Sequence, residues 1–259
     1  EKIGGWKKVS INTFEGSVRV MRDFTTLDSE NYLFLGSEKK IYLEAGGFFN
    51  AITPIRKTTS PLSGSTPIAT GSAGSGIVTI TDSSHAAIVG DFVTLSGATT
   101  VDGVTAAQLN KEHEVTVVVD SNNYKVDTGG AASSGTTAGG GGSVVAVYQI
   151  NVGLNTTVLG SGWGAGVYGR GTWNSASGSL AATNLRLWYM DTFGEDVITN
   201  IANGSIYFWD ATAGTARAVE LNTLTGSNEA PTVAKTVLVS EVDRHILVFG
   251  ANTINTSDQ

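Results

Sequence analysis

The sequence predicts an all-β protein, built from β-propeller-like four-stranded blades with a small β-barrel domain inserted between them. Three observations lead to this fold class. The 259 residues include 33 Gly and only 4 Pro, a composition that suits many short strands joined by tight turns. No apolar pattern with helical spacing extends beyond two turns. Short apolar or alternating runs recur along the chain in the same order.

The first blade is predicted within residues 17–53. Residues 18–22 alternate apolar and polar side chains, as a half-buried strand does. Residues 31–36 form a fuller apolar run, which favours a central strand, and residues 40–44 follow after a polar turn. A Gly46-Gly47 turn then allows residues 49–52 to return as a fourth strand.

The same plan recurs twice. Its second copy takes in residues 185–189, 196–199, 205–209 and 217–219, and its third takes in residues 233–240 and 245–250. Four short strands at a spacing of roughly 50 residues is the period of a propeller blade, and stacked blades bury faces that single blades expose. A plain antiparallel meander with strands that are similar by chance is the alternative.

An inserted domain interrupts the blades. Four strand-like runs lie in it, at residues 76–80, 91–95, 114–119 and 123–126. One weak helical turn is expected within residues 103–112, and the Gly/Ser-rich tract of residues 128–143 is predicted to be flexible. The predicted domains are therefore 1–59 for the first blade part, 60–145 for the small barrel, and 146–259 for the second blade part.

Composition narrows the classes of partner. The net charge of −7 and the pI of about 4.9 disfavour nucleic-acid binding, although an acidic channel wall would let DNA slide past without adhering. The absence of Cys excludes disulfides and thiolate metal sites. No run reaches the roughly 18 apolar residues of a membrane span. Without an initial Met or a signal-peptide pattern, the sequence is expected to be a segment of a longer protein.

A Gly- and Trp-rich segment, residues 160–173, is the most unusual stretch. Its glycines suggest a phosphate-binding loop, but it lacks the helix pattern and the Lys-Ser or Lys-Thr pair that such loops need. The structural interpretation is better: Trp163, Tyr168 and Trp173 act as packing anchors against the sheet or a neighbouring subunit. Arg170 is expected to stack on an aromatic ring or pair with a carboxylate.

Catalytic and metal-binding patterns are scarce. His85, His113 and His245 lie far apart, with no ligand spacing, and no nucleophile-elbow motif occurs. Glu195 and Asp196 are the one candidate carboxylate pair, but neighbours on a strand point to opposite faces, which favours a solvated turn. The sequence therefore predicts no enzyme, no cofactor and no metal site.

Several short motifs resemble tail proteins of tailed bacteriophages. They are residues 5–9, 42–44 with 52–56, 162–166, 187–188 with 193–196, 207–210, and 239–240 with 243–245. Within that group the chain is similar to the nozzle (tail tubular, or tail stabilisation) proteins of short-tailed phages. Residues 77–126 resemble the small β-barrel that is inserted in many phage tail proteins.

The resemblance implies a structural role in the virion. Nozzle proteins are propeller-based subunits of a cyclic homo-oligomer, a hexamer, at the distal tail. Such rings line the genome-ejection channel, let DNA pass without specific binding, and contact the adaptor and the fibres or needle. They are assembled in the host bacterial cytoplasm, and the family has no catalytic residues to transfer.

Two other function classes stay open. A receptor- or glycan-binding module of a phage tail or cell-surface protein would use the exposed aromatic residues of the Gly-rich segment to stack on sugars. A propeller glycosidase acting on surface polysaccharide would depend on Glu195 or Asp196.

Overall fold

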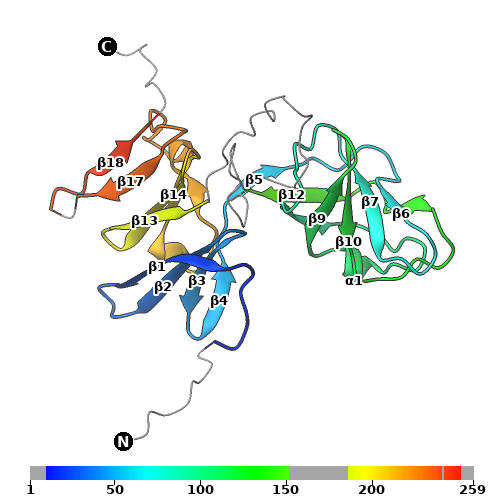
Figure 1. Ribbon diagram of the computed structural model, residues 1–259, viewed down its shortest axis with the longest axis horizontal. Coiled ribbons are helices and arrows are strands. Elements are labelled where there is room, and N and C mark those ends of the chain that lie inside the picture. Colours follow the sequence, from blue (N-terminus) through cyan, green and yellow to red (C-terminus); the bar gives the residue numbers. More distant parts are fainter. Residues whose placement is uncertain (1–9, 152–185, 241, 252–259) are drawn as a thin grey trace, which may run out of the picture. The chain divides into compact units, whose positions relative to one another are not determined.

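The computed structural model describes residues 10–151, 186–240 and 242–251 (Figure 1). The chain divides into two compact units. The first, called the blade unit, comprises Glu1–Thr53 and Val152–Gln259; the second, the inserted unit, comprises Pro54–Asn151. The predicted domain limits of 59/60 and 145/146 stay predictions. The limits between the two compact units, 53/54 and 151/152, make the inserted unit longer at both ends.

Three antiparallel sheets form the described part of the blade unit, which confirms the predicted fold class (Figure 1). The first has the order β1-β2-β3-β4 and the second the order β13-β14-β15-β16, while the third consists of β17 and β18. Their strands are β1 (Val18–Thr25), β2 (Asn31–Ser37), β3 (Ile41–Ala45), β4 (Phe48–Ala51), β13 (Trp188–Phe193), β14 (Asp196–Ile201), β15 (Ile206–Trp209), β16 (Val219–Glu220), β17 (Thr236–Val239) and β18 (Ile246–Phe249). Two 3-10 turns, η1 (Ala211–Ala213) and η2 (Leu221–Thr223), flank β16.

Tight turns set the register of these sheets. β3 and β4 are joined by Gly46 and Gly47, whose φ angles are +61° and +87°. A two-residue hairpin turn that matches the right-handed twist of the strands needs positive φ at both positions, and glycine adopts it without strain. The predicted Gly-Gly turn thereby pairs Ala45 with Phe48.

Aromatic side chains pack the first sheet on the second. Trp209, only 1% exposed, meets the rings of Phe34 and Tyr32 edge-on at centroid distances of 5.1 and 5.6 Å. Close approach also depends on Gly36, because a Cβ there would lie 2.5 Å from the Trp188 ring. The Trp188 indole N–H donates to the Ser37 carbonyl at 3.0 Å, which satisfies its one polar atom.

The second sheet packs on the third through aliphatic side chains. Ile198 and Ile206 lie in one buried cluster with Val237 and Val239, and Ile246 and Val248 pack against it. Asp191 on β13 contacts both neighbouring sheets: it accepts from the Arg22 guanidinium and from the Val239 N–H, both at 2.9 Å. The three sheets therefore stack as successive blades would.

The inserted unit is one eight-stranded antiparallel sheet. Its order is β11-β6-β7-β10-β9-β8-β12-β5, and among the described residues no pairing joins β11 to β5. The prediction of a closed small barrel is therefore wrong in this respect: the unit is an open sheet. Its elements are β5 (Ile55–Thr58), β6 (Ile68–Thr70), β7 (Ile77–Thr81), β8 (Phe92–Ser96), α1 (Ala106–Leu109), β9 (Glu112–Val118), β10 (Asn123–Asp127), β11 (Ala138–Gly139) and β12 (Val145–Gln149).

The Gly/Ser-rich tract is held in place rather than loose. The Asp102 carboxylate accepts from the Ser134 hydroxyl at 2.7 Å and from the Gly135 N–H at 3.2 Å, and the Thr70 hydroxyl donates to the Gly135 carbonyl at 2.7 Å. Ala132 within the tract is buried. The prediction of a flexible tract is thus corrected, because polar groups outside the tract satisfy its backbone.

Candidate functional site

The aromatic segment chosen from the sequence lies outside the described residues. Trp163, Tyr168, Arg170 and Trp173 all fall within residues 152–185. Their role as packing or interaction anchors stays a prediction. The other sequence candidate, Glu195 with Asp196, lies in a described part of the blade unit and lines a pocket there.

This pocket has a volume of about 540 Å³ and opens where connecting turns of all three blades meet. Its lining comes from the β1–β2 turn, the β13–β14 turn, the start of η1 and the β17–β18 turn. The lining residues are Thr25, Leu27, Phe193, Gly194, Glu195, Asp196, Asp210, Ala211, Thr212 and Arg244. Three carboxylates, one guanidinium and two large apolar side chains, Leu27 and Phe193, thus share one concave surface.

Glu195 and Asp196 take different partners although they are neighbours in sequence. The Glu195 carboxylate accepts from the Leu27 N–H at 2.6 Å, which joins the β1–β2 turn to the β13–β14 turn. The Asp196 carboxylate accepts from the Ala211 N–H at 3.0 Å, at the start of η1. As expected from the sequence, the two acids do not act as a direct pair.

Asp196 and Asp210 have opposite electrostatic environments. Burial raises the pKa of Asp196, and the negative charges of Asp210 and Glu195 act in the same direction. The Thr212 hydroxyl, followed by the Thr212 backbone N–H, lowers the pKa of Asp210. The pKa values of the two carboxyl groups are therefore shifted in opposite directions, Asp196 upward and Asp210 downward.

Arg244 supplies the positive charge of the pocket. It lies at the tip of the β17–β18 turn with a φ of +51°, and its N–H donates to the Ser240 carbonyl at 2.8 Å. Its guanidinium lies 3.5 Å from the position that a Cβ on Gly194 would occupy. The guanidinium of Arg244 therefore lies close to the acidic turn, where Gly194 has a φ of +72°. Groups of this kind can hydrogen-bond a polyhydroxylated ligand in both directions.

Sequence reasoning missed Asp210 and Arg244 as site residues. Asp210 directly follows the third strand of the second blade, and Asp196 begins its second strand. In an antiparallel pair the start of one strand lies beside the end of the next, and Val197 pairs with Trp209, so Asp196 and Asp210 share one end of the sheet. The internal repeat combined with this rule could have found Asp210, whereas Arg244 depends on how the third sheet packs.

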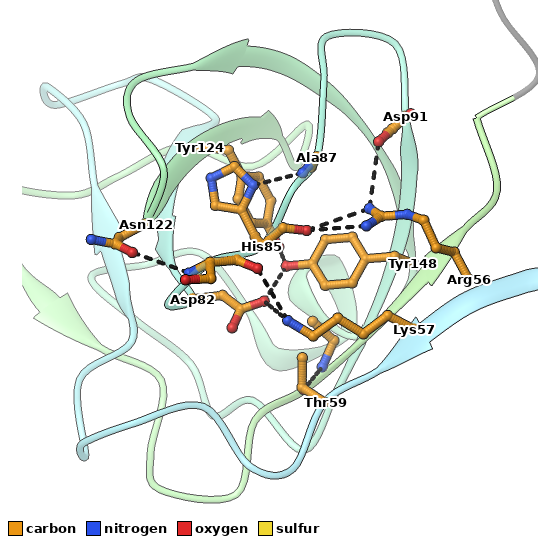
Figure 2. A network of polar contacts seen from close by, with 12 residues as sticks. Arg56, Lys57, Thr59, Asp82, His85, Ala87, Asp91, Asn122, Tyr124 and Tyr148 are labelled. Carbon is orange, nitrogen blue, oxygen red and sulfur yellow. Dashed lines mark hydrogen bonds and ion pairs between the residues drawn. The ribbon is translucent and has the colours of Figure 1, made fainter.

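A second polar cluster lies in the inserted unit (Figure 2). The Tyr148 hydroxyl donates to the Asp82 carboxylate at 2.7 Å and lies 3.0 Å from the Tyr124 hydroxyl, while Lys57 Nζ lies 3.7 Å from the same carboxylate. Arg56 donates to the His85 carbonyl at 3.3 Å. Burial raises the pKa of both tyrosines, so both hydroxyls stay protonated.

We call this cluster the clamp. Its contacts are structural, and its members are Arg56, Lys57, Asp82, His85 and Tyr148. His85 Nδ1 accepts from the Ala87 N–H at 2.9 Å, so Nε2 carries the proton and donates to the Asp120 carbonyl at 2.9 Å. Both ring nitrogens of His85 thus bond to backbone groups of neighbouring turns. The clamp joins β5 and β12, where the chain enters and leaves the inserted unit.

Neither a metal site nor a membrane span is found in the described ranges. Over residues 10–151, 186–240 and 242–251, no group of three or more His, Cys, Asp or Glu side chains could hold a metal ion. In the same ranges no helix combines the length and the hydropathy needed to cross a membrane.

Comparisons with known proteins give only weak structural similarity. No protein-family model and no curated protein matches the chain. Among solved structures it is similar to one described as phage phi92 endosialidase, with a TM-score of 0.30 and 13% sequence identity. That similarity covers 85% of this chain and 32% of the other, so the chain spans about a third of the matched structure.

The matched structure is by its name a phage protein, and that name does not extend to a nozzle protein. The prediction that this chain is not an enzyme is contradicted, because the matched protein is by name an enzyme. We therefore withdraw the prediction of a non-enzyme.

Proposed function

We propose that this chain is a structural subunit of a bacteriophage tail and that, within the tail, it belongs to the nozzle ring of a short-tailed phage. The observation that carries the proposal is the stack of sheets in the blade unit; within the described residues its last sheet has an exposed apolar face. Such a stack is an architectural element, since each sheet is stabilised mainly by the sheet beside it.

The open face belongs to the β17–β18 hairpin. Val237 and Val239 point into the stack and are at most 9% exposed, whereas Leu238, Leu247 and Phe249 on the other face are 46–50% exposed. Leu238 pairs directly with Leu247, so these side chains form a continuous patch. Contiguous exposed apolar patches mark surfaces that another protein covers.

Under this proposal the chain assembles as a cyclic homo-oligomer, a hexamer, in the host bacterial cytoplasm and is then carried in the virion tail. Its neighbours are the adaptor and the fibres or needle. The net charge of −7 suits a channel through which DNA passes without specific binding, because like charges repel at the wall.

The proposal is tested on the full 259-residue chain and on phage particles that contain its sequence. We expect ring-shaped particles by negative-stain electron microscopy, a matching oligomer mass by sedimentation, and antibody labelling at the distal tail. A chain that stays monomeric at tens of micromolar and labels no part of the virion would contradict it.

The acidic pocket favours a second candidate function, receptor or glycan binding. Its carboxylates, its guanidinium and the Phe193 and Leu27 side chains are the group types that bind saccharides through hydrogen bonds and apolar contact. We expect bacterial surface polysaccharides to change the intrinsic tryptophan fluorescence saturably, and Glu195→Gln with Asp210→Asn to abolish this response.

Asp120→Asn, in the inserted unit, is the matched control for these pocket variants and should leave the response unchanged. Release of new reducing ends from the same polysaccharides would extend the second candidate to a glycosidase. No response across the panel would remove saccharide binding and leave the structural proposal untouched.

A further inference from the structure

The acidic pocket of the blade unit holds more negative than positive charge. Glu195, Asp196 and Asp210 line it, and Arg244 is the one basic residue of its lining. In the part of the chain that the structure describes, no ion pair joins Arg244 to any of the three acids. The negative charge of the pocket is therefore not neutralised from within, and a positively charged ligand would be attracted to it.

Repulsion between the acids supports this charge balance. Burial raises the pKa of Asp196, and the nearby negative charges of Asp210 and Glu195 raise it further. A cation placed among these carboxylates would relieve the repulsion, whereas an anionic ligand would add to it. The pocket is therefore better suited to a cationic ligand than to an acidic one.

The pocket acids are held by turns and keep acceptor capacity for a ligand. The Glu195 carboxylate accepts from the Leu27 N–H at 2.6 Å through Oε1. The Asp210 carboxylate accepts from the Thr212 N–H and hydroxyl at 2.8 and 2.6 Å, both through Oδ1. An ionised carboxylate accepts about four hydrogen bonds over its two oxygens, so both acids can accept more. An ammonium group, with three donors and a positive charge, matches such acceptors best.

The rest of the lining suits a sugar better than a simple amine. Arg244 offers hydrogen-bond donors, the hydroxyls of Thr25 and Thr212 offer donors and acceptors, and Phe193 and Leu27 add apolar surface. A lysine side chain presents one ammonium group on an apolar stem and would leave these polar groups unused, whereas the hydroxyls around a sugar ring would use them. The volume of about 540 Å³ is typical of small-molecule sites, which span roughly 300–1,000 Å³.

We infer that the acidic pocket selects amino sugars, saccharides that carry a free ammonium group, over their N-acetylated and acidic counterparts. The ammonium group donates to the Glu195 and Asp210 carboxylates, Arg244 donates to sugar oxygens, and the Phe193 side chain contacts the apolar face of a sugar ring. This inference rests on the second candidate function, saccharide binding at the same pocket, and adds to it the class of saccharide.

The probes are a β-1,4-linked glucosamine tetramer, its N-acetylated form and a galacturonic acid tetramer. Each is titrated calorimetrically into the full 259-residue protein at a mildly acidic pH that keeps the amino groups charged. We expect the glucosamine tetramer to bind about tenfold more tightly than its N-acetylated form, because charge-assisted hydrogen bonds are roughly twice as strong as neutral ones. The acidic tetramer should not bind, and added salt should weaken glucosamine binding.

Failure to bind the glucosamine tetramer, equal affinity for its N-acetylated form, or a preference for either other tetramer would overturn the inference. Saccharide binding as such would still stand if the bacterial polysaccharides change the tryptophan fluorescence. If they give no response either, saccharide binding at the pocket is lost together with the inference.

Glu195→Gln and Asp210→Asn, made singly, test where the ammonium group binds. Each keeps the shape of its side chain and an acceptor for its turn, and each should weaken glucosamine binding about tenfold, since hydrogen bonds to charged groups are the strong ones. Two variants keep the test valid if one of them does not fold. Glu229→Gln, at an exposed acid of the same unit outside the pocket, is the matched control and should leave the affinity unchanged. An equal loss in the control would overturn the inference, because the attraction would then belong to the acidic surface in general.

Arg244→Gln distinguishes a cationic ligand from an anionic one. The glutamine amide keeps hydrogen-bond donors and removes the charge that repels an ammonium group, so the glucosamine tetramer should bind about twofold more tightly. A large loss of affinity would mean that Arg244 recognises an anionic group and would overturn the inference. Tight binding of tetralysine in place of the glucosamine tetramer would also overturn it, and would assign the pocket to a basic segment of a protein.

Discussion

The blade unit and the inserted unit differ in how they end their sheets. The inserted unit terminates at β5, whose Arg56 lies 5.3 Å from the centroid of the Tyr148 ring and whose Lys57 contacts Asp82, so its edge is charged and tied to its own core. The blade unit ends, within the described residues, at β18, which has an apolar edge and an apolar outer face.

This difference separates a self-contained module from a repeat. The buried cluster of the inserted unit, from Leu62 to Tyr148, draws on β6, β7, β8, β9, β10 and β12 of its sheet. In the blade unit each interface joins only adjacent sheets, as in other stacked repeats. A destabilising substitution should therefore lower the stability of its own unit only. The largest losses are expected at the sheet-to-sheet interfaces of the blade unit.

The largest effect is expected from Trp209→Ala. This side chain is 1% exposed and packs on Phe24, Tyr32 and Phe34, so its removal leaves a large cavity between the first two sheets. Cavities of this kind cost about 3–5 kcal/mol. Hydrogen exchange measured by mass spectrometry should show lost protection in β1–β4 and β13–β16, with β5–β12 unchanged. Equal loss in both units would refute the separation.

A smaller effect at the same interface is expected from Gly36→Ala. The added Cβ would lie 2.5 Å from the Trp188 ring, so the two sheets must move apart at a cost of about 1–3 kcal/mol. Gly142→Ala in the inserted unit is the control, because its Cβ would have no atom closer than 3.9 Å. Denaturant midpoints compare the two variants. Similar shifts for both would argue against tight packing at Gly36.

Much of the blade unit could be predicted from the sequence because its signals are local. Apolar alternation over residues 18–22 and the Gly46-Gly47 turn each act within a few residues, and both elements appear where expected. Strands β5, β6, β11 and β12 were missed. β6 and β11 have three and two residues, and β12 pairs with β8 and β5, which are distant in sequence.

The candidate site was predictable only in part, because sequence signals are local and the pocket combines turns that are distant in sequence. Glu195 and Asp196 stand out as adjacent acids in a turn, but the residues that complete the pocket come from other blades. Leu27 and Arg244 lie in turns that tertiary packing alone brings to this place. The open outline of the inserted unit was mispredicted because strand signals in a sequence do not show how the sheet closes.

The clamp of the inserted unit is tested by Tyr148→Phe. This change removes the hydroxyl that donates to Asp82 and leaves a buried carboxylate with one fewer donor. The expected loss is about 1–2 kcal/mol of the free energy of unfolding of the inserted unit. Tyr32→Phe is the matched control, since its hydroxyl bonds to Glu30 at the surface, and should stay within about 0.5 kcal/mol. Calorimetry that shows equal losses would contradict a special role for the clamp.

The smallest effect, and the one that bears on the pocket, is expected from Asp196→Asn. Because burial raises the pKa of Asp196, the folded state holds its proton more tightly than the unfolded state does. Stability therefore falls as pH rises through the pKa of the folded state, and the ionised Asp196 lowers the stability of the blade unit slightly at neutral pH.

The side-chain amide of the Asp196→Asn variant keeps an acceptor for the Ala211 N–H without the charge of Asp196. At pH 7 we expect Asp196→Asn to stabilise the blade unit by less than about 0.5 kcal/mol, since solvent screens a partly exposed group. This gain should vanish as pH falls below the ordinary value of 3.8, where both states are protonated. Denaturant titrations at pH 3 and pH 7, roughly bracketing that range, measure it; a variant that destabilises at pH 7 would mean that the charge is used to hold the pocket together.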